Sequence, residues 1–292
     1  LKLEQGMGNP LRKKVLICPL DWGLGHASRM VPIVKLLCEN ADHEVILGVN
    51  GASGSFLREA FPALESIDMP SANISYSHGK SQVTSLFCQL PKIIYTTIRE
   101  HYRLKDLVSR ENLSCVISDH RLGLFHKGLL SILVIHQLKM QFPRKLNILE
   151  KLFNWIQSMI FTKFDQIWIP DFPDEESVAG RLSVVPHQRS DRFYYIGILS
   201  RFFLPRIQSN IQGYKYDILV VLSGPEPQRT ELEKRLLEQL MGMDKKVLFV
   251  RGIWQEPSRV DNGNITFIDH VGQRELASAF ALTCVMATMV PP

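Results

Sequence analysis

A histidine stands at the start of a predicted helix, directly after a turn that contains two glycines. The stretch KKVLICPLDWGLGHASR (13–29) runs from an apolar strand-like segment through Gly23 and Gly25 to His26. The free N–H groups of a first helical turn and the positive end of the helix dipole bind anions, typically phosphates. An imidazole beside such an anion titrates near neutrality and can act as a general base. His26 is therefore the candidate catalytic residue.

Two simpler readings of this loop stay open. His26 could only cap the helix, although Ser, Asn or Asp would serve that purpose better. Trp22 could pack in the core, or it could support a sugar ring or a lipid chain. The candidate binding residues of the segment are Trp22, Gly23, Gly25, Ser28 and Arg29.

Polar side chains also follow two later strand-like segments. Asp119, His120 and Arg121 come directly after one apolar segment, and His136 and Gln137 end the next. Parallel strands present their carboxyl ends at one edge of the sheet, so these groups are candidate acceptor contacts. Structural hydrogen bonding between loops is the alternative. The histidines lack H-x-x-x-H or H-E-x-x-H spacing, so we predict no dedicated metal site.

A second candidate anion loop follows a strand-like segment at 216–222. Ser223 and Gly224 end this segment, prolines stiffen the turn, and Thr230 can cap the next helix, so that its amides could face a diphosphate. Gln228 and Arg229 are candidate contacts to phosphate or ribose. The alternatives are a loop without a ligand and, for Arg229, a solvated surface charge.

Strand-like and helix-like segments alternate along the chain, which predicts α/β architecture with parallel sheets. The pattern breaks into prolines, glycines and charges between Asp171 and Gln212, which is typical of an interdomain connection. We predict two Rossmann-like domains facing a cleft, spanning residues 13–196 and 214–292. The predicted strands are 15–20, 44–49, 115–118, 132–136, 166–169, 216–222, 246–250 and 265–268; the predicted helical segments are 27–38, 55–60, 81–110 with a break at Pro91, 147–161, 230–240 and 273–281.

The first glycine turn does not match a dinucleotide-binding fingerprint. The G-x-G-x-x-G spacing would require glycine at Ser28, and Val49, Asn50 and Gly51 replace the acid expected at the end of the second strand. An oxidoreductase is therefore disfavoured.

Composition restricts the remaining classes. The chain has 292 residues, a net charge of +5 and a pI near 8.9, which suits anionic substrates or lipid head groups without indicating nucleic acid. The five scattered cysteines lie mostly in apolar contexts that are typical of buried free thiols. Together with the lack of a signal peptide or membrane span, they predict a cytoplasmic protein. The segment 144–164 mixes basic and apolar residues at helical spacing. It either packs against its own sheet or touches a membrane surface.

Four segments together resemble a known family. DWGLGHASR, ISDHRLG (117–123), IHQ (135–137) and VLSGPEPQRT (221–230) occur in the order seen in bacterial GT-B glycosyltransferases related to the peptidoglycan N-acetylglucosaminyltransferase. The resemblance extends from Lys13 to about Glu275. It implies an N-terminal acceptor domain, a C-terminal nucleotide-sugar domain with UDP-sugar as the donor, and a glycan or glycolipid acceptor at the inner membrane face. It also implies sugar transfer with inversion, without a metal or other cofactor.

The sequence departs from that family at its end. Family members continue through further βα units, whereas this chain finishes as LTCVMATMVPP. We therefore expect an incomplete second domain that lacks part of the donor site. A non-hydrolysing nucleotide-sugar epimerase and an inactive acceptor-binding fragment are the alternative functions.

Overall fold

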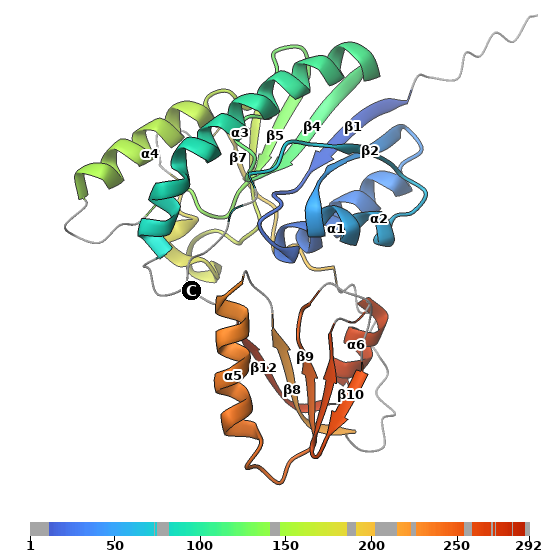
Figure 1. The fold of residues 1–292 in the computed structure, drawn as a ribbon. Coiled ribbons are helices and arrows are strands. Elements are labelled where there is room, and N and C mark those ends of the chain that lie inside the picture. The colour runs from blue at the N-terminus through green and yellow to red at the C-terminus, as the bar shows by residue number, and fades with distance from the viewer. Residues whose placement is uncertain are drawn as a thin grey trace, which may run out of the picture.

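Two α/β units, each built on its own sheet, make up the chain in a computed structural model (Figure 1). The structure describes residues 12–72, 74, 82–140, 147–185, 191–201, 215–222, 226–253, 259–269, 271, 273–281 and 283–289. Mixed α/β architecture with Rossmann-like sheets is confirmed.

The first sheet has seven strands in the order β3-β2-β1-β4-β5-β6-β7, and every neighbouring pair is parallel. Its strands are β1 (Lys13–Cys18), β2 (His43–Val49), β3 (Glu65–Asp68), β4 (Leu113–Asp119), β5 (Leu130–Val134), β6 (Gln166–Ile169) and β7 (Phe193–Tyr195). The inner strands are nearly continuous apolar runs, as expected for a sheet that is covered on both faces.

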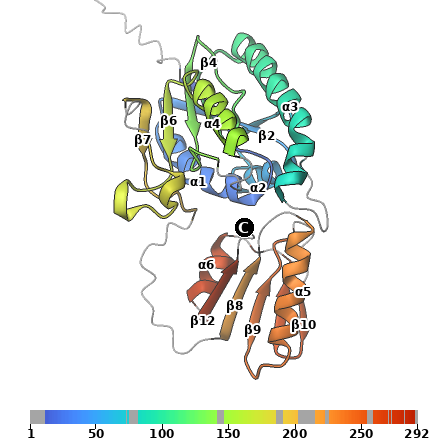
Figure 2. The same ribbon diagram turned by 90° about the vertical axis from the view of Figure 1, so that its left-hand side faces the viewer.

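Helices cover both faces of this sheet (Figure 2). Helices α1 (Leu24–Glu39) and α2 (Gly51–Ala60) bury Met30 and Leu57 against one face. Helices α3 (Gln82–Glu111) and α4 (Asn147–Phe161) pack Leu104 and Phe161 against the other. Two short 3-10 turns, Asp174–Glu176 and Gly180–Leu182, follow β6.

The strand order reverses between β1 and β4. The chain adds β2 and β3 on one side of β1 and then crosses to place β4 on the other side. Open parallel sheets bind ligands at such a switch point, beyond the carboxyl ends of the strands. The loops that follow β1 and β4 therefore meet where a ligand is expected.

The second sheet has five strands in the order β10-β11-β9-β8-β12. They are β8 (Tyr216–Leu222), β9 (Val247–Val250), β10 (Arg259–Asn262), β11 (Ile265–Ile268) and β12 (Thr283–Met289), with helices α5 (Gln228–Leu240) and α6 (Gln273–Ala281). Among the strand pairs that the structure describes in this sheet, only β10–β11 is antiparallel.

Several sequence predictions about the elements were wrong. Helix α3 continues through Pro91, where we expected a break, because packing of its later turns outweighs one lost backbone hydrogen bond. Strand β7 lies inside the predicted interdomain connection and completes the first sheet. The short strands β3 and β10 were missed because neither contains a fully buried side chain.

The C-terminal segment forms structure that the sequence analysis did not anticipate. Its backbone makes strand β12, which pairs in parallel with β8 from Thr283↔Tyr216 to Met289↔Leu222. The expectation that the second domain is incomplete stays a prediction. None of the described helices is long and apolar enough to cross a membrane.

Candidate active site

A buried carboxylate and an arginine form the centre of the site at the switch point. Asp119 ends β4 and is fully buried, and Arg29 lies one turn into α1. The Arg29 guanidinium donates from Nε to Asp119 Oδ2 at 2.8 Å and from Nη2 to Asp119 Oδ1 at 2.5 Å. A bidentate contact of this kind fixes both side chains in one orientation.

Three imidazoles surround this ion pair. His26 Nδ1 lies 2.9 Å from Asp119 Oδ2, and His120 Nδ1 lies 3.1 Å from Oδ1. Arg29 Nη1 lies 2.8 Å from His136 Nδ1. The structure thus brings together five of the predicted site residues from the ends of β1, β4 and β5.

The hydrogen-bond partners of an imidazole restrict where its proton can sit, and in this cluster they fix the tautomer of His136. Arginine is only a donor, so His136 Nδ1 must accept from Arg29, and the proton of neutral His136 is on Nε2. His26 Nδ1 lies between an acceptor, Asp119 Oδ2, and a donor, Arg29 Nη2 at 2.6 Å. In the tautomer with its proton on Nδ1, His26 donates to Asp119 and leaves a free lone pair on Nε2, whereas in the other tautomer Nδ1 accepts from Arg29.

Burial and the charges of the cluster shift three pKa values. Burial alone would raise the pKa of Asp119, but His26 and Arg29 hold it well below its usual range. Burial lowers the pKa of His136 to about 3, with His120 and Arg29 adding to the effect. Burial also lowers the pKa of His120 against the opposing hydrogen bond to Asp119. The cluster therefore holds an ionised carboxylate beside neutral His120 and His136.

His120 also has an unusual backbone conformation. Its φ of 55° lies in the left-handed region, which residues other than glycine rarely adopt. Its amide donates to Val134 O at 3.1 Å, which holds the turn after β4 against β5. Strained backbone of this kind concentrates at functional sites.

The same residues present a possible metal-binding geometry that the sequence spacing did not reveal. Ligand atoms of His26, Asp119 and His120 lie within 4.8 Å of one another. Arg29 Nη2, however, is within 3.0 Å of a ligand atom of all three residues. The guanidinium is thus the cation of this donor set, and the residues do not fit a resident metal ion.

The loop between β1 and α1 is held in place by helix α2 and by the segment after β3. Ser53 is buried and donates to Gly23 O at 3.0 Å, while Ser71 hydrogen-bonds to Asp21. A Cβ added at Gly23 or Gly25 would meet no protein atom within 4 Å. Neither glycine is required by packing within the described residues, so both leave room for a ligand to approach the backbone.

Four other predicted acceptor residues lie outside the cluster. Arg121 is buried and binds Glu100 at 2.7 Å and Pro19 O at 2.7 Å, so it joins loops to α3. Ser28 and Gln137 are half-buried. Trp22 is also half-buried, and its Nε1 has no hydrogen-bond partner among the residues that the structure describes.

The predicted donor loop is described only in part, because Ser223 and Gly224 lie outside the described residues. Thr230 does not cap α5, which begins at Gln228; instead Glu226 accepts from Thr230 N at 3.3 Å. The surface-charge alternative for Arg229 is wrong, since this side chain is buried and pairs with Glu233 at 2.6 Å. Buried Gln228 Oε1 has no partner in the described part of the chain.

Sequence reasoning missed two residues that support the site, Ser53 and Glu100. Glu100 precedes Leu104 and Leu107 on the buried stripe of α3. An acidic residue within an apolar stripe signals a buried ion pair, so this residue could have been found. Ser53 gives no such signal, because its role depends on where α2 meets the loop after β1.

Comparison with solved structures gives the fold type. No protein-family model matches the sequence, and no curated protein matches it. The glycotransferase of kitacinnamycin aligns over 96% of this chain and 76% of its own, with a TM-score of 0.56 and 13% identity. A UDP-glucosyltransferase from Polygonum tinctorium aligns over 98% and 73%, with a TM-score of 0.52 and 13% identity.

A third similar structure is a different kind of enzyme. A putative UDP-N-acetylglucosamine 2-epimerase from Listeria monocytogenes aligns over 95% of this chain and 74% of its own, with a TM-score of 0.51 and 12% identity. At these identities the likeness shows the fold alone, which is the Rossmann-like GT-B architecture. The specific relation to the peptidoglycan enzyme stays a prediction.

Proposed function

We propose that this protein is a glycosyltransferase that moves a sugar from a nucleotide diphosphate to an acceptor hydroxyl, with His26 as the general base. The single observation that carries the proposal is the 2.9 Å contact between His26 Nδ1 and buried Asp119 Oδ2 at the switch point. A carboxylate on Nδ1 orients the ring, presents Nε2 to the substrate and stabilises the imidazolium that forms.

The proposed reaction is a direct displacement. The acceptor oxygen bonds to the anomeric carbon and loses its proton to His26 Nε2, while the bond from that carbon to the diphosphate breaks. Attack opposite the leaving group inverts the anomeric centre. The nucleoside diphosphate takes the bonding electrons, and helix N-terminal amides and cationic side chains stabilise its charge without a metal.

The two units have separate roles in this proposal. Residues 13–196 bind the acceptor, and residues 214–292 bind part of the nucleotide sugar, with Ser223, Gly224, Gln228, Arg229 and Thr230 as donor contacts. A UDP-sugar, of N-acetylglucosamine or a similar hexose, is the proposed donor. The similar structures include a UDP-glucosyltransferase, which supports this choice of nucleotide.

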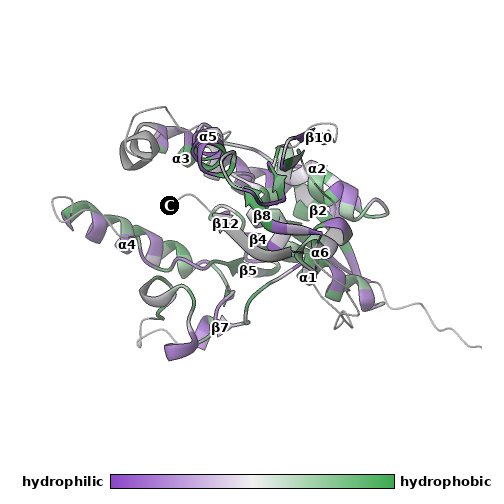
Figure 3. Ribbon diagram, turned by 90° about the horizontal axis from the view of Figure 1, so that it is seen from below, coloured by the Kyte–Doolittle hydropathy of each residue, from purple (hydrophilic) through white to green (hydrophobic). Residues whose placement is uncertain are grey.

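The proposed acceptor is a glycan or glycolipid of the cell envelope, bound at the inner membrane face. Helix α4 supports a membrane contact, because it exposes Ile148, Leu152, Trp155, Ile156 and Met159 along one side. Apolar residues recur along this helix (Figure 3). Lys151 and Lys163 are also exposed, and such a basic, aromatic face suits an anionic lipid surface.

The membrane contact can be tested by vesicle sedimentation. We expect the protein to sediment with vesicles of anionic phospholipid, and the exchange Trp155→Glu to abolish this. Leu36→Glu, at an equally exposed leucine of α1, is the matched control and should sediment like the parent. Equal loss in both variants, or no sedimentation of the parent, would contradict a contact through α4.

The transferase is tested by UDP release from UDP-sugars with candidate acceptors, in buffer with EDTA. We expect acceptor-dependent release, reduced about 10²- to 10⁴-fold by His26→Asn. His43→Asn changes a half-buried histidine at the amino end of β2 and is the control that should retain activity. Full activity of His26→Asn would refute the assigned base.

The epimerase-like neighbour provides the second candidate function. An epimerase would convert UDP-N-acetylglucosamine to its 2-epimer without an acceptor and without releasing UDP, which chromatography of the products detects. A folded chain that binds UDP by calorimetry but turns over no donor would instead be the inactive fragment.

A further inference from the structure

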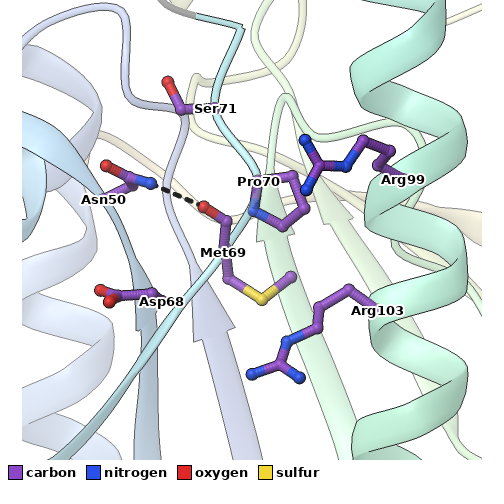
Figure 4. A pocket seen from close by; sticks show the side chains of 7 residues that line it. All are labelled: Asn50, Asp68, Met69, Pro70, Ser71, Arg99 and Arg103. Carbon is purple, nitrogen blue, oxygen red and sulfur yellow. Dashed lines mark hydrogen bonds between the residues drawn. The ribbon is translucent and has the colours of Figure 1, made fainter.

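A pocket of about 480 Å³ lies beside the candidate active site, and no residue of it was predicted to bind a substrate. It is lined by Asn50, Asp68, Met69, Pro70, Ser71, Arg99 and Arg103 (Figure 4). Its volume is within the range of small-molecule sites. Two arginines on successive turns of α3 make it suited to an anion.

The charge of the pocket is positive. Figure 4 shows the Arg99 and Arg103 side chains extending from α3 beside the segment 68–71. The lining includes one carboxylate, Asp68, and it pairs with Arg58 outside the pocket at 2.7 Å. Arg103 pairs with Asp106 at 3.0 Å, whereas Arg99 is exposed and has its guanidinium carbon 5.8 Å from the Tyr95 ring centroid. Arg99 is therefore the side chain best placed to receive an oxyanion.

The wall opposite the arginines is fixed by hydrogen bonds. Asn50 Nδ2 donates to Met69 O at 2.8 Å, which joins the ends of β2 and β3. Arg121 Nη1 donates to Pro70 O at 2.8 Å, and Ser71 hydrogen-bonds to Asp21 in the loop before α1. The pocket wall is thus bonded to both loops that carry the catalytic candidates, and it needs little ordering when a ligand binds.

The position in the sheet gives the spacing between the strands that precede the pocket and His26. The pocket follows the carboxyl ends of β2 and β3, and His26 follows β1 in the same parallel sheet. Strands are spaced about 4.8 Å apart, so β3 lies about 10 Å from β1. One substrate of sugar-phosphate size or larger can span both places.

We propose that this pocket binds an oxyanion of the acceptor, a phosphate or a carboxylate that is remote from the attacking hydroxyl. The inference rests on the proposed transferase function, which it deepens by assigning the acceptor to an anionic class. Guanidinium groups bind both kinds of oxyanion through paired N–H donors. The pocket would hold the acceptor in register while His26 takes the proton.

Chemical labelling of individual arginines tests the proposal with a readout that does not require catalytic activity. The full chain is treated with phenylglyoxal, with or without inorganic diphosphate or glucuronate, and modification is measured on chymotryptic peptides. We expect diphosphate, glucuronate or both to slow labelling of Arg99 and Arg103 at least threefold, and the more protective probe identifies phosphate or carboxylate as the oxyanion. Arg110, exposed on the same helix and outside the pocket lining, should be unaffected.

Binding variants complete the test. The double variant Arg99→Gln/Arg103→Gln should bind the protective probe at least about tenfold more weakly in calorimetry, since each lost charge-assisted contact weakens binding severalfold. Arg110→Gln should bind like the parent. Protection of all three arginines alike, or of none, would overturn the proposal.

The transferase proposal can fail separately from this one. UDP release and its loss in His26→Asn report on catalysis, whereas probe binding reports only on the pocket. Probe binding without transfer would leave an anion site in a protein that is not a transferase. Transfer to uncharged acceptors that is unaffected by the double variant would refute the anion-binding role of the pocket and leave the transferase proposal standing.

Discussion

Replacing Asp119 by asparagine should destabilise the protein far more than replacing His26. The Asp119 carboxylate is fully buried and accepts two hydrogen bonds from Arg29, so Asp119→Asn leaves a largely buried guanidinium without a counter-charge. Breaking a buried pair in this way costs about 3 to 5 kcal/mol. For a unit of this size the melting temperature should fall by about 6 to 20 °C.

The matched changes separate charge from shape. His26→Asn leaves the Arg29–Asp119 pair intact and should cost about 1 kcal/mol, although it removes the proposed base. The double variant Arg29→Gln/Asp119→Asn removes both charges and should be more stable than Asp119→Asn alone. Urea unfolding followed by circular dichroism measures all three. A double variant whose losses simply add would refute the argument.

The same experiment has a pH dependence with a fixed sign. The pKa of folded Asp119 lies well below 3.8, so its stabilisation is present above about pH 4 and is lost as pH falls through the folded pKa. The stability difference between the parent and Asp119→Asn should therefore shrink below pH 4. Asp42→Asn, the same exchange at an exposed turn, is the matched control.

Three further outcomes are expected. Gly25→Ala should leave the free energy of unfolding within about 0.5 kcal/mol, because the added Cβ meets no atom within 4 Å. The same exchange should lower UDP release at least tenfold if a ligand approaches this backbone, and unchanged release would argue against an anion at this helix start. Burial raises the pKa of Glu100 to about 7 against the effect of Arg121, so the folded state binds more protons than the unfolded state between about pH 4.5 and 7. The free energy of unfolding should therefore fall as pH rises through that range in the parent but not in Glu100→Gln. Iodoacetamide should label exposed Cys38 in the native protein and spare Cys18, whose pKa is raised to about 12 by burial; equal labelling of the two thiols would show that Cys18 is accessible.

The cysteine prediction corrects part of the sequence interpretation. The sequence placed most cysteines in apolar, buried surroundings, but among the described thiols Cys18 is buried, Cys115 is half-buried and Cys38 is exposed. Helical periodicity alone did not reveal that Cys38 falls on the outer side of α1. The side on which a residue falls depends on how the helix rests on the sheet.

The sequence by itself determined the architecture of the first unit and most of its candidate site. Alternating apolar segments predicted the parallel sheet, and in such a sheet the polar residues directly after β1, β4 and β5 necessarily lie together at its carboxyl edge. Local pattern suffices there because strand direction and chain order leave few other topologies. It did not suffice for β3, β7 and β12, whose strand pairing is a long-range interaction without a periodic signature.

Only the tertiary structure decided how the polar residues divide their roles. Arg29 and Arg121 look alike in sequence, yet Arg29 fills the centre of the imidazole cluster while Arg121 holds Glu100 and the loops behind it. The pocket of Arg99 and Arg103 likewise joins α3 to Asn50 after β2 and to the segment 68–71 at the end of β3, which are distant in the chain. Hydrogen bonds and ion pairs depend on positions within a few tenths of an ångström, and only the packed fold sets positions that finely.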